Sequence, residues 1–452
     1  MPIEAAIAVH RYGLGARPGE MAAASADPRG WLLAQLHNGA DQPQPLDSEP
    51  LQSGAEITKR YIELVRARRD ARMDGGSAKK DVDAFKEFLH EFLREMSARF
   101  ALGFTTQKPF AERLVWFWSN HFAVSAQSAA VGLAGPFERE AIRPHIAGTF
   151  EDMLVASTKH PAMLVYLSNA QSIGPDSLAG LISGKGLNEN LGREIMELHT
   201  LGVRSGYTQA DVINFAKVIT GWSVYPPRRF PERSGEFWFN ERMHEPGAQI
   251  VLGKSYPENG FAQGRAVLEM LAYHPATAKH IATKLVRHFV ADAPPADLVA
   301  RLAKRFHDTG GDLMQVTRTL VTAPEAWTAP RTKLKKPGEW MMAAMRSSGL
   351  QIRDVRHLIN TQNLLGEPLW RPPAPKGFSD NSAEWVDGLA ERLDIANQTA
   401  RLIGNGGSEP DAMVDSALGP LASAETRQTV RRAESRPQAL ALLLMSPEFQ
   451  RR

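Results

Sequence analysis

The residues best suited to chemistry in this chain of 452 residues lie in the segment 187–201. One face of a helix there carries the apolar residues Leu187, Leu191, Ile195, Leu198 and Leu201. Glu194 falls within this face and Glu197 lies along its edge. A carboxylate on an apolar face needs a cationic partner, a metal ion or a proton, so Glu194 is expected to be largely buried beside one. Side chains three residues apart reach one target, which makes Glu194 and Glu197 the first catalytic candidates.

A third catalytic candidate is His121, in an aromatic helix predicted over residues 109–122. This helix is apolar nearly all round, which predicts burial on all sides. A buried neutral imidazole serves as a metal ligand or a general base. Together with Glu194 and Glu197 it would support a hydrolase, through a divalent metal ion that activates water or through metal-free acid–base catalysis. The identity of such a metal is not indicated.

Further side chains are candidates for binding a substrate, either a small molecule or a polymer. They are Asn120, Asn190, Arg193, His244 and Trp370. His244 lies in a long loop predicted over residues 223–261, where it can close over the site as part of a lid. Arg193 lies off the apolar face, so it is expected to tie its helix to a neighbour rather than to pair with Glu194.

A structural interpretation of the same residues stays open. A buried carboxylate can form a salt bridge or hold a loop by its N–H groups, and a core histidine is commoner than a catalytic one. The chain would then be a non-catalytic helical binding or assembly protein, whose buried polar network fixes the fold. The two interpretations differ in whether Glu194, Glu197 and His121 converge on an open pocket.

The elements that position these residues are predicted to be mostly helical. Helices are expected over residues 57–73, 80–103, 109–122, 136–148, 187–201, 208–220, 262–273, 276–290, 296–307, 312–321, 337–349, 384–402, 424–433 and 437–446. Strand signal is confined to residues 236–240 and 249–252, which are expected to pair as a small hairpin. The pattern predicts a large irregular multi-helix domain over residues 1–330 and a helical C-terminal part over 331–452, packed on it.

Composition excludes several classes of protein. The 53 Lys and Arg against 50 Asp and Glu give a net charge of +3, without the concentrated basic face of a nucleic-acid-binding protein. No apolar run is long enough to span a membrane. The count of 0 cysteines excludes thiolate catalysis and cysteine-based zinc sites. The segment Met1–Val9 lacks the pattern of a secretory signal, which favours a cytoplasmic location for the chain as written.

Several ordered motifs together resemble one family. They are Asn188-Glu189-Asn190, Arg193-Glu194, Glu197-Leu198-His199-Thr200-Leu201-Gly202, Tyr207-Thr208, Asp211-Val212, Thr220-Gly221-Trp222, Trp118-Ser119-Asn120-His121-Phe122, His274-Pro275-Ala276-Thr277-Ala278 and Gly366-Glu367-Pro368-Leu369-Trp370-Arg371-Pro372-Pro373. The chain is similar, from about Tyr12 to its end, to a bacterial domain of unknown function catalogued as number 1800. The resemblance implies a mostly helical protein and assigns no reaction, substrate or cofactor.

The resemblance carries two further expectations. Many members look exported, and their genes often lie beside a second family of exported proteins, which implies a partner protein from a neighbouring gene and export as the alternative location. Gly192 stands where the family usually has alanine. Glycine there costs about 1 kcal/mol of helix stability, which predicts that another group approaches the backbone closely.

Overall fold

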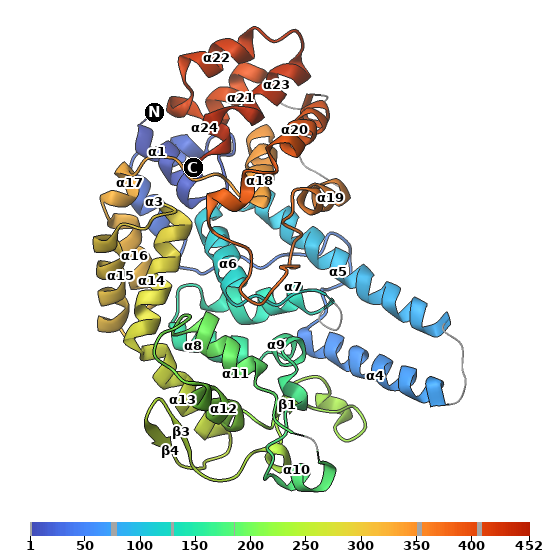
Figure 1. The fold of residues 1–452 in the computed structure, drawn as a ribbon. Coiled ribbons are helices and arrows are strands. Elements are labelled where there is room, and N and C mark those ends of the chain that lie inside the picture. Colours follow the sequence, from blue (N-terminus) through green and yellow to red (C-terminus); the bar gives the residue numbers. More distant parts are fainter. Residues whose placement is uncertain (1, 74–78, 128–130, 185, 350–354, 405–408) are drawn as a thin grey trace.

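The computed structural model describes residues 2–73, 79–127, 131–184, 186–349, 355–404 and 409–452. The protein is mostly α-helical, with two small antiparallel sheets among the described residues, so the predicted fold class is confirmed (Figure 1). Within those ranges, no helix has the length and apolar character needed to cross a membrane.

The first part of the chain surrounds α6. Its helices are α1 (Ile3–Ile7), α2 (Glu20–Ala23), α3 (Pro28–Ala34), α4 (Gly54–Met73), α5 (Lys79–Thr105), α6 (Pro109–His121), α7 (Ala134–Phe137), α8 (Phe150–Lys159) and α9 (Pro161–Tyr166). In Figure 1 the ends of α4 and α5 project side by side from the body. Helix α6 begins at Pro109, whose fixed φ suits a first helical turn. Ten of its residues are buried, including Glu112 and Arg113, so the predicted burial of this helix is confirmed.

The middle of the chain contains the motif segment and a helical layer. Its helices are α10 (Leu178–Ser183), α11 (Asn190–Glu194), α12 (Gln209–Val218), α13 (Phe261–Tyr273), α14 (Pro275–Phe289), α15 (Ala296–Asp308), α16 (Leu313–Thr322) and α17 (Glu325–Thr328). Helices α14, α15 and α16 pack in chain order along one side of the molecule in Figure 1. Helix α14 packs beside α6 through Phe289, which contacts Phe110 and Phe117.

The predicted strands exist, but their expected pairing is wrong. Strand β2 (Phe237–Phe239) pairs with β1 (Trp222–Val224), and β3 (Gln249–Val251) pairs with β4 (Lys254–Tyr256). The second hairpin turns at Leu252 and Gly253, which both have positive φ, at 50° and 75°. Two such residues form the turn whose twist matches a tight hairpin, so β3 pairs with the strand that follows it at once.

The C-terminal helices pack on the N-terminus of the chain. They are α18 (Pro337–Ser348), α19 (Arg356–Leu364), α20 (Leu389–Gly404), α21 (Pro410–Ala417), α22 (Ala424–Arg431), α23 (Arg436–Met445) and α24 (Pro447–Gln450). Figure 1 shows α1 beside this group, and α1 contacts the turn Gly419–Leu421. One connected hydrophobic core includes residues on both sides of position 330, such as Leu114 and Trp340. The division of the chain at residue 330 stays a prediction.

Candidate functional site

The motif segment forms a shorter helix than residues 187–201. Helix α11 ends at Glu194, and the chain continues as a wider π-helical turn over Ile195–His199. The hydroxyl of Thr200 donates to the carbonyl oxygen of Ile195 at 2.7 Å, five residues back. A turn with this spacing changes which residues face the core. His199 is therefore buried, whereas Leu198, on the predicted apolar face, is partly exposed.

Glu194 is partly exposed, so the expectation that it would be largely buried is wrong. The helix begins only at Asn190, and the π turn shifts the apolar face away from Glu194. The partial burial of Glu194 raises its pKa, and repulsion by the charge of Glu197 raises it further. Glu197 accepts a hydrogen bond from the hydroxyl of Tyr207, and its carboxylate lies 3.6 Å from the guanidinium of Arg193. The two carboxylates thus lie within electrostatic reach of each other on a half-open surface.

Arg193 ties its helix to a neighbour, as predicted. Its guanidinium donates to Gln209, the first residue of α12, and lies 2.9 Å from the carboxylate of Glu189. The expected close approach to Gly192 is also confirmed. A Cβ atom built there would lie 3.2 Å from the backbone nitrogen of Ala216 on α12, so the absent side chain lets the two helices touch. Asn190 is exposed at the start of α11.

His121 lies in the core rather than beside the two glutamates. Its side chain is 1% exposed, and its Nε2 is 3.0 Å from the carbonyl oxygen of His199. Because a carbonyl only accepts, Nε2 carries the proton and Nδ1 is left with a lone pair and no partner. Burial lowers the pKa of His121 well below its ordinary value, so the ring is neutral. Among the described residues, no hydrogen bond or ion pair joins this ring to Glu194 or Glu197, and no group of three or more His, Asp or Glu side chains has the arrangement of a metal site.

His244 is buried against the end of α12. Its Nδ1 lies 3.1 Å from the carbonyl oxygen of Thr220, and the hydroxyl of Thr220 accepts a hydrogen bond from the backbone N–H of Glu245. Glu245 is itself buried and pairs with Lys217 at 3.0 Å. These contacts hold the segment around His244 against the end of α12. Among the described residues, no hydrogen bond joins His244 to His121.

The structure brings together two of the predicted binding residues, Asn120 and Trp370, at the wall of one cavity. The side-chain amide of Asn120 pairs with the backbone of Phe378, donating at 2.8 Å and accepting at 2.7 Å. The indole N–H of Trp370 donates to Glu138 at 3.0 Å. Ser125 adds a hydrogen bond to the carbonyl oxygen of Pro372. The proline-rich segment 366–379 is thus held across the end of α6, and the cavity lies beneath it.

The cavity offers about 80 Å³ to the centres of water-sized molecules, and its walls combine apolar rings with polar groups. Trp116 and Trp370 supply the rings, and the guanidinium of Arg99 lies over both, at 4.4 and 5.5 Å from the ring centres. Lys336 and Gln362 supply polar groups. The side-chain oxygen of Gln362 is buried and has no hydrogen-bond partner among the residues that the structure describes. A wall of this kind suits a small molecule with both an apolar face and polar substituents.

Glu367 is a carboxyl group of the cavity whose pKa lies above its ordinary value. Its Oε2 accepts a hydrogen bond of 2.7 Å from the backbone N–H of Gly338, in the first turn of α18. Burial raises the pKa of Glu367, while the charge of Lys336 and the bond from Gly338 oppose that rise, and Glu339 adds to it. Its second carboxyl oxygen makes no hydrogen bond or ion pair with any described residue.

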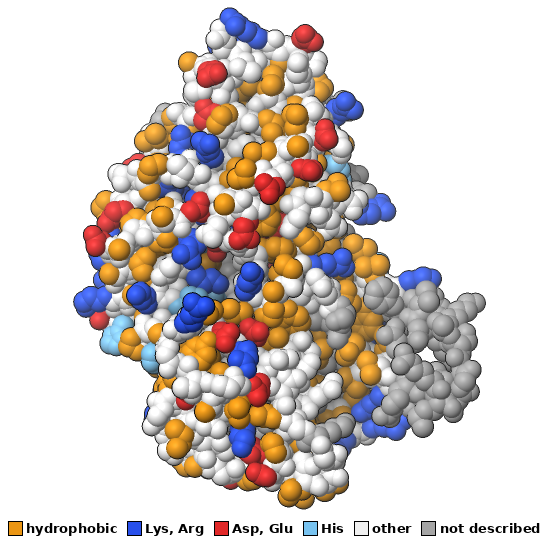
Figure 2. All heavy atoms as spheres, viewed as in Figure 1, with side chains coloured by type: hydrophobic (Ala, Val, Ile, Leu, Met, Phe, Trp, Pro, Cys, Tyr) orange, Lys and Arg blue, Asp and Glu red, His pale blue; other side chains and the backbone are white. Residues whose placement is uncertain are grey.

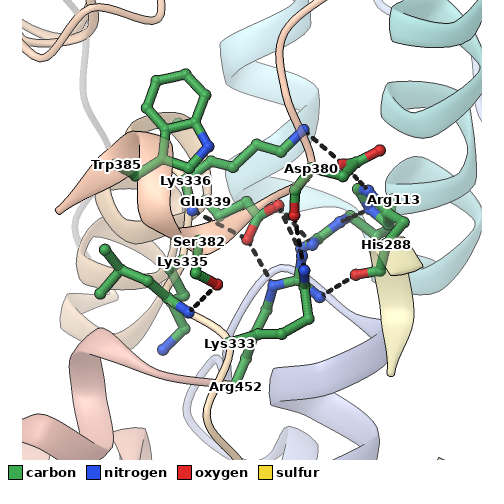
Figure 3. A network of polar contacts seen from close by, with 12 residues as sticks. Arg113, His288, Lys333, Lys335, Lys336, Glu339, Asp380, Ser382, Trp385 and Arg452 are labelled. Atoms are coloured by element: carbon green, nitrogen blue, oxygen red, sulfur yellow. Dashed lines mark hydrogen bonds and ion pairs between the residues drawn. The ribbon is translucent and has the colours of Figure 1, made fainter. Parts of the chain in front are cut away.

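A buried network of ions supports the floor of the cavity (Figure 3). Glu339 receives Arg113 at 2.6 Å and Arg452 at 2.7 Å. His288 accepts from Arg113 at its Nε2 and contacts Asp380 through Nδ1 at 2.7 Å. An imidazole that accepts at one nitrogen and donates at the other is neutral, and burial accordingly lowers the pKa of His288 to about 3. The members come from α6, α14, α18, the irregular segment that contains Asp380, and the chain end (Figure 3).

The pKa values of the two cavity glutamates are shifted in opposite directions. Arg113 and Arg452 overcome the effect of burial and hold the pKa of Glu339 well below its ordinary value, so Glu339 is ionised. Glu367, which lacks such partners, is shifted the other way. Asp380 pairs with His288 and, at 2.8 Å, with Lys336, and its pKa is also lowered. The cavity therefore has a fixed electrostatic floor and one carboxyl group that can exchange a proton.

Sequence analysis did not select Lys336, Glu339 or Glu367 as site residues. One available signal was the presence of Glu112 and Arg113 in a helix predicted to be buried on all sides, because buried charges require partners elsewhere in the chain. Their partners include Arg143 for Glu112 and Glu339 for Arg113. Nothing local in the sequence names those partners.

A family model described as "Protein of unknown function (DUF1800)" matches residues 7–451. The chain belongs to the DUF1800 family. The resemblance inferred from the ordered motifs is therefore confirmed over essentially the whole chain. No curated protein and no solved structure matches it. Residues from two of those motifs line the cavity, Asn120 from one and Glu367 and Trp370 from the other.

Proposed function

We propose that the cavity beneath segment 366–379 binds a small polar organic molecule and that Glu367 transfers protons in its hydrolysis. The observation that carries the proposal is the position of Glu367, whose carboxyl group faces the cavity with one oxygen fixed by Gly338 and the other available. A carboxyl group fixed in this way is oriented for proton transfer to a bound molecule.

The chemistry follows from the two states of that carboxyl group. A raised pKa brings Glu367 closer to neutral pH, where a group both accepts and returns a proton efficiently. In its ionised form it would take a proton from an attacking water molecule, and in its neutral form it would protonate the leaving group. Lys336 and Arg99 on the same walls would stabilise negative charge that develops on the substrate, since charges act strongly where water is largely excluded.

The shape of the cavity supports a limited class of substrate. Trp116 and Trp370 offer flat apolar surfaces, and the unpartnered oxygen of Gln362 accepts a hydrogen bond from a hydroxyl or amide group. A small ester, amide or glycoside combines such groups. A large folded polymer does not fit a cavity of this size, so a polymer would enter only by its end.

Glu194 and Glu197, without His121, form the second catalytic candidate. It is supported by the electrostatic coupling of the two glutamates and by the hydroxyl of Tyr207 on Glu197. The alternative of a non-catalytic binding or assembly protein is supported by the buried ion network, which fixes the fold whether or not catalysis occurs.

The test is a panel of chromogenic esters, amides, glycosides and phosphate esters, assayed with the wild-type chain, Glu367→Gln and a matched control, Glu194→Gln. Loss of proton transfer should lower kcat about 100-fold or more in Glu367→Gln while its melting temperature is kept, and Glu194→Gln should remain active. Full activity of Glu367→Gln overturns the proposal. Loss of activity in Glu194→Gln alone would assign the catalytic site to α11. Saturable binding of panel compounds without turnover would favour the non-catalytic alternative.

A further inference from the structure

Helix α14 carries two cations that form no direct ion pair with any described residue. Lys284 and Arg287 lie three residues apart, so they share one face of the helix. Neither makes a hydrogen bond or an ion pair with another described residue, and the Nε atom of Arg287 is buried without a partner. Both side chains are only partly exposed. Buried or half-buried cations are normally paired, so this pair lacks its expected partner.

The surroundings of Lys284 contain more positive than negative charge. The carboxylate that acts on it is Asp380, which is already held by Lys336 at 2.8 Å and by His288 at 2.7 Å. Burial is the largest cause that lowers the pKa of Lys284 to about 8, and Lys336 and Arg287 add to that effect. The positive charges around this ammonium group therefore outnumber the negative ones, and a bound anion would reduce the imbalance.

Three neutral histidines lie within electrostatic reach of the same ammonium group. Lys284 is the strongest charge acting on His121 and His199, and it acts on His280 as well. The rings of His199 and His280 each lie 6.1 Å from that of His121. Nδ1 of His121 and Nε2 of His199 are buried without hydrogen-bond partners. The cluster therefore contains unsatisfied polar atoms besides the two cations, and none of the three rings supplies the missing negative charge.

Figure 2 shows Lys and Arg side chains around a hollow near the middle of one face of the molecule. We propose that Lys284 and Arg287, which share one face of α14, bind a small oxyanion, a carboxylate or a phosphate group. An ammonium and a guanidinium group together form charge-assisted hydrogen bonds with such a group and restore local charge balance.

Neither Lys284 nor Arg287 lines the cavity of Glu367, although Lys336, which lines it, acts electrostatically on Lys284. The ligand of Lys284 and Arg287 is therefore expected to bind whether or not Glu367 can ionise. The proposal does not depend on hydrolysis, and a failure of one experiment leaves the other intact.

The test measures anion binding by isothermal titration calorimetry at constant ionic strength, with inorganic phosphate, acetate and citrate as separate probes and chloride as the background salt. The wild-type chain should bind phosphate or a carboxylate saturably, and the probe that binds more tightly identifies the class. Lys284→Met and Arg287→Gln should each raise Kd about tenfold or more, because each removes a charge-assisted hydrogen bond.

Lys279→Met is the matched control, since Lys279 is an exposed cation on the same helix. Its Kd should equal that of the wild type. Absence of saturable binding by the wild-type chain overturns the proposal, as does an unchanged Kd in both site variants. An equal rise of Kd in Lys279→Met would show a general effect of net charge and would also overturn the proposal. Circular dichroism of each variant establishes that the helices are retained.

Discussion

Replacing Lys284 by methionine should stabilise the protein in the absence of a ligand. Methionine has a similar length, removes no hydrogen bond or ion pair of the described residues, and suits a half-buried site. The lowering of the pKa from 10.5 to about 8 corresponds to at most about 3 kcal/mol, at about 1.4 kcal/mol for each pH unit. Because the side chain is partly exposed, solvent screening reduces this, and we expect a gain of about 1–2 kcal/mol at pH 7.

The gain should depend on pH in a direction that identifies its cause. Between about pH 8 and 10.5 the unfolded chain binds a proton at Lys284 that the folded chain does not, so wild-type stability rises with pH in that window. The charge of Lys284 destabilises the folded wild type fully below about pH 8, and this effect disappears above about pH 10.5. The advantage of Lys284→Met should shrink accordingly.

Urea unfolding of the wild type, Lys284→Met and the exposed control Lys279→Met at pH 7 and pH 10.5 measures this difference. The control should change the free energy of unfolding by less than about 0.5 kcal/mol at both pH values. A loss of stability in Lys284→Met at pH 7, or a gain of equal size at both pH values, would refute the reasoning, because either result means that the ammonium group is not the source of the cost.

Three further variants test the cavity and its floor. Glu339→Gln leaves its two arginine partners buried without a carboxylate and should lower the free energy of unfolding by about 3–5 kcal/mol in urea titrations, whereas exposed Glu236→Gln should change it little. Glu367→Gln should match wild-type stability near pH 4 and exceed it at pH 7, because a raised pKa makes wild-type stability fall as pH rises; a constant difference would contradict this. Asn120→Ala should speed amide exchange of Phe378 with deuterium, and unchanged exchange would show that the amide pair does not hold segment 366–379.

Several features of this protein follow from residues close together in the chain. The helical fold follows from apolar residues at helical spacing, and the burial of α6 follows from its nearly continuous apolar sequence. The pattern Thr208-x-x-Asp211 predicts a capping box, and both of its hydrogen bonds are present at the start of α12. The approach of α12 to Gly192 follows from the cost of glycine in a helix. The first three depend on interactions within a few turns of the chain, and for Gly192 the local cost of glycine predicted that a group approaches without saying which one.

Other features depend on the tertiary structure. The π turn after α11 shifts the apolar face, so a wheel of 3.6 residues per turn misplaces Glu194 and misses the burial of His199. The partner of β2 was misassigned because pairing depends on turn geometry and on the path of the chain.

The candidate site was least accessible to sequence reasoning. Arg113 and Glu339 are separated by 226 residues, and Glu339 and Arg452 by 113, yet they form one buried network. The sequence by itself determined that the charges of α6 needed partners, because a buried ion without one is too costly. Which residues met that need, and the cavity that their meeting leaves beside Glu367, were decided by how distant helices pack, since no local pattern records contacts between segments so far apart.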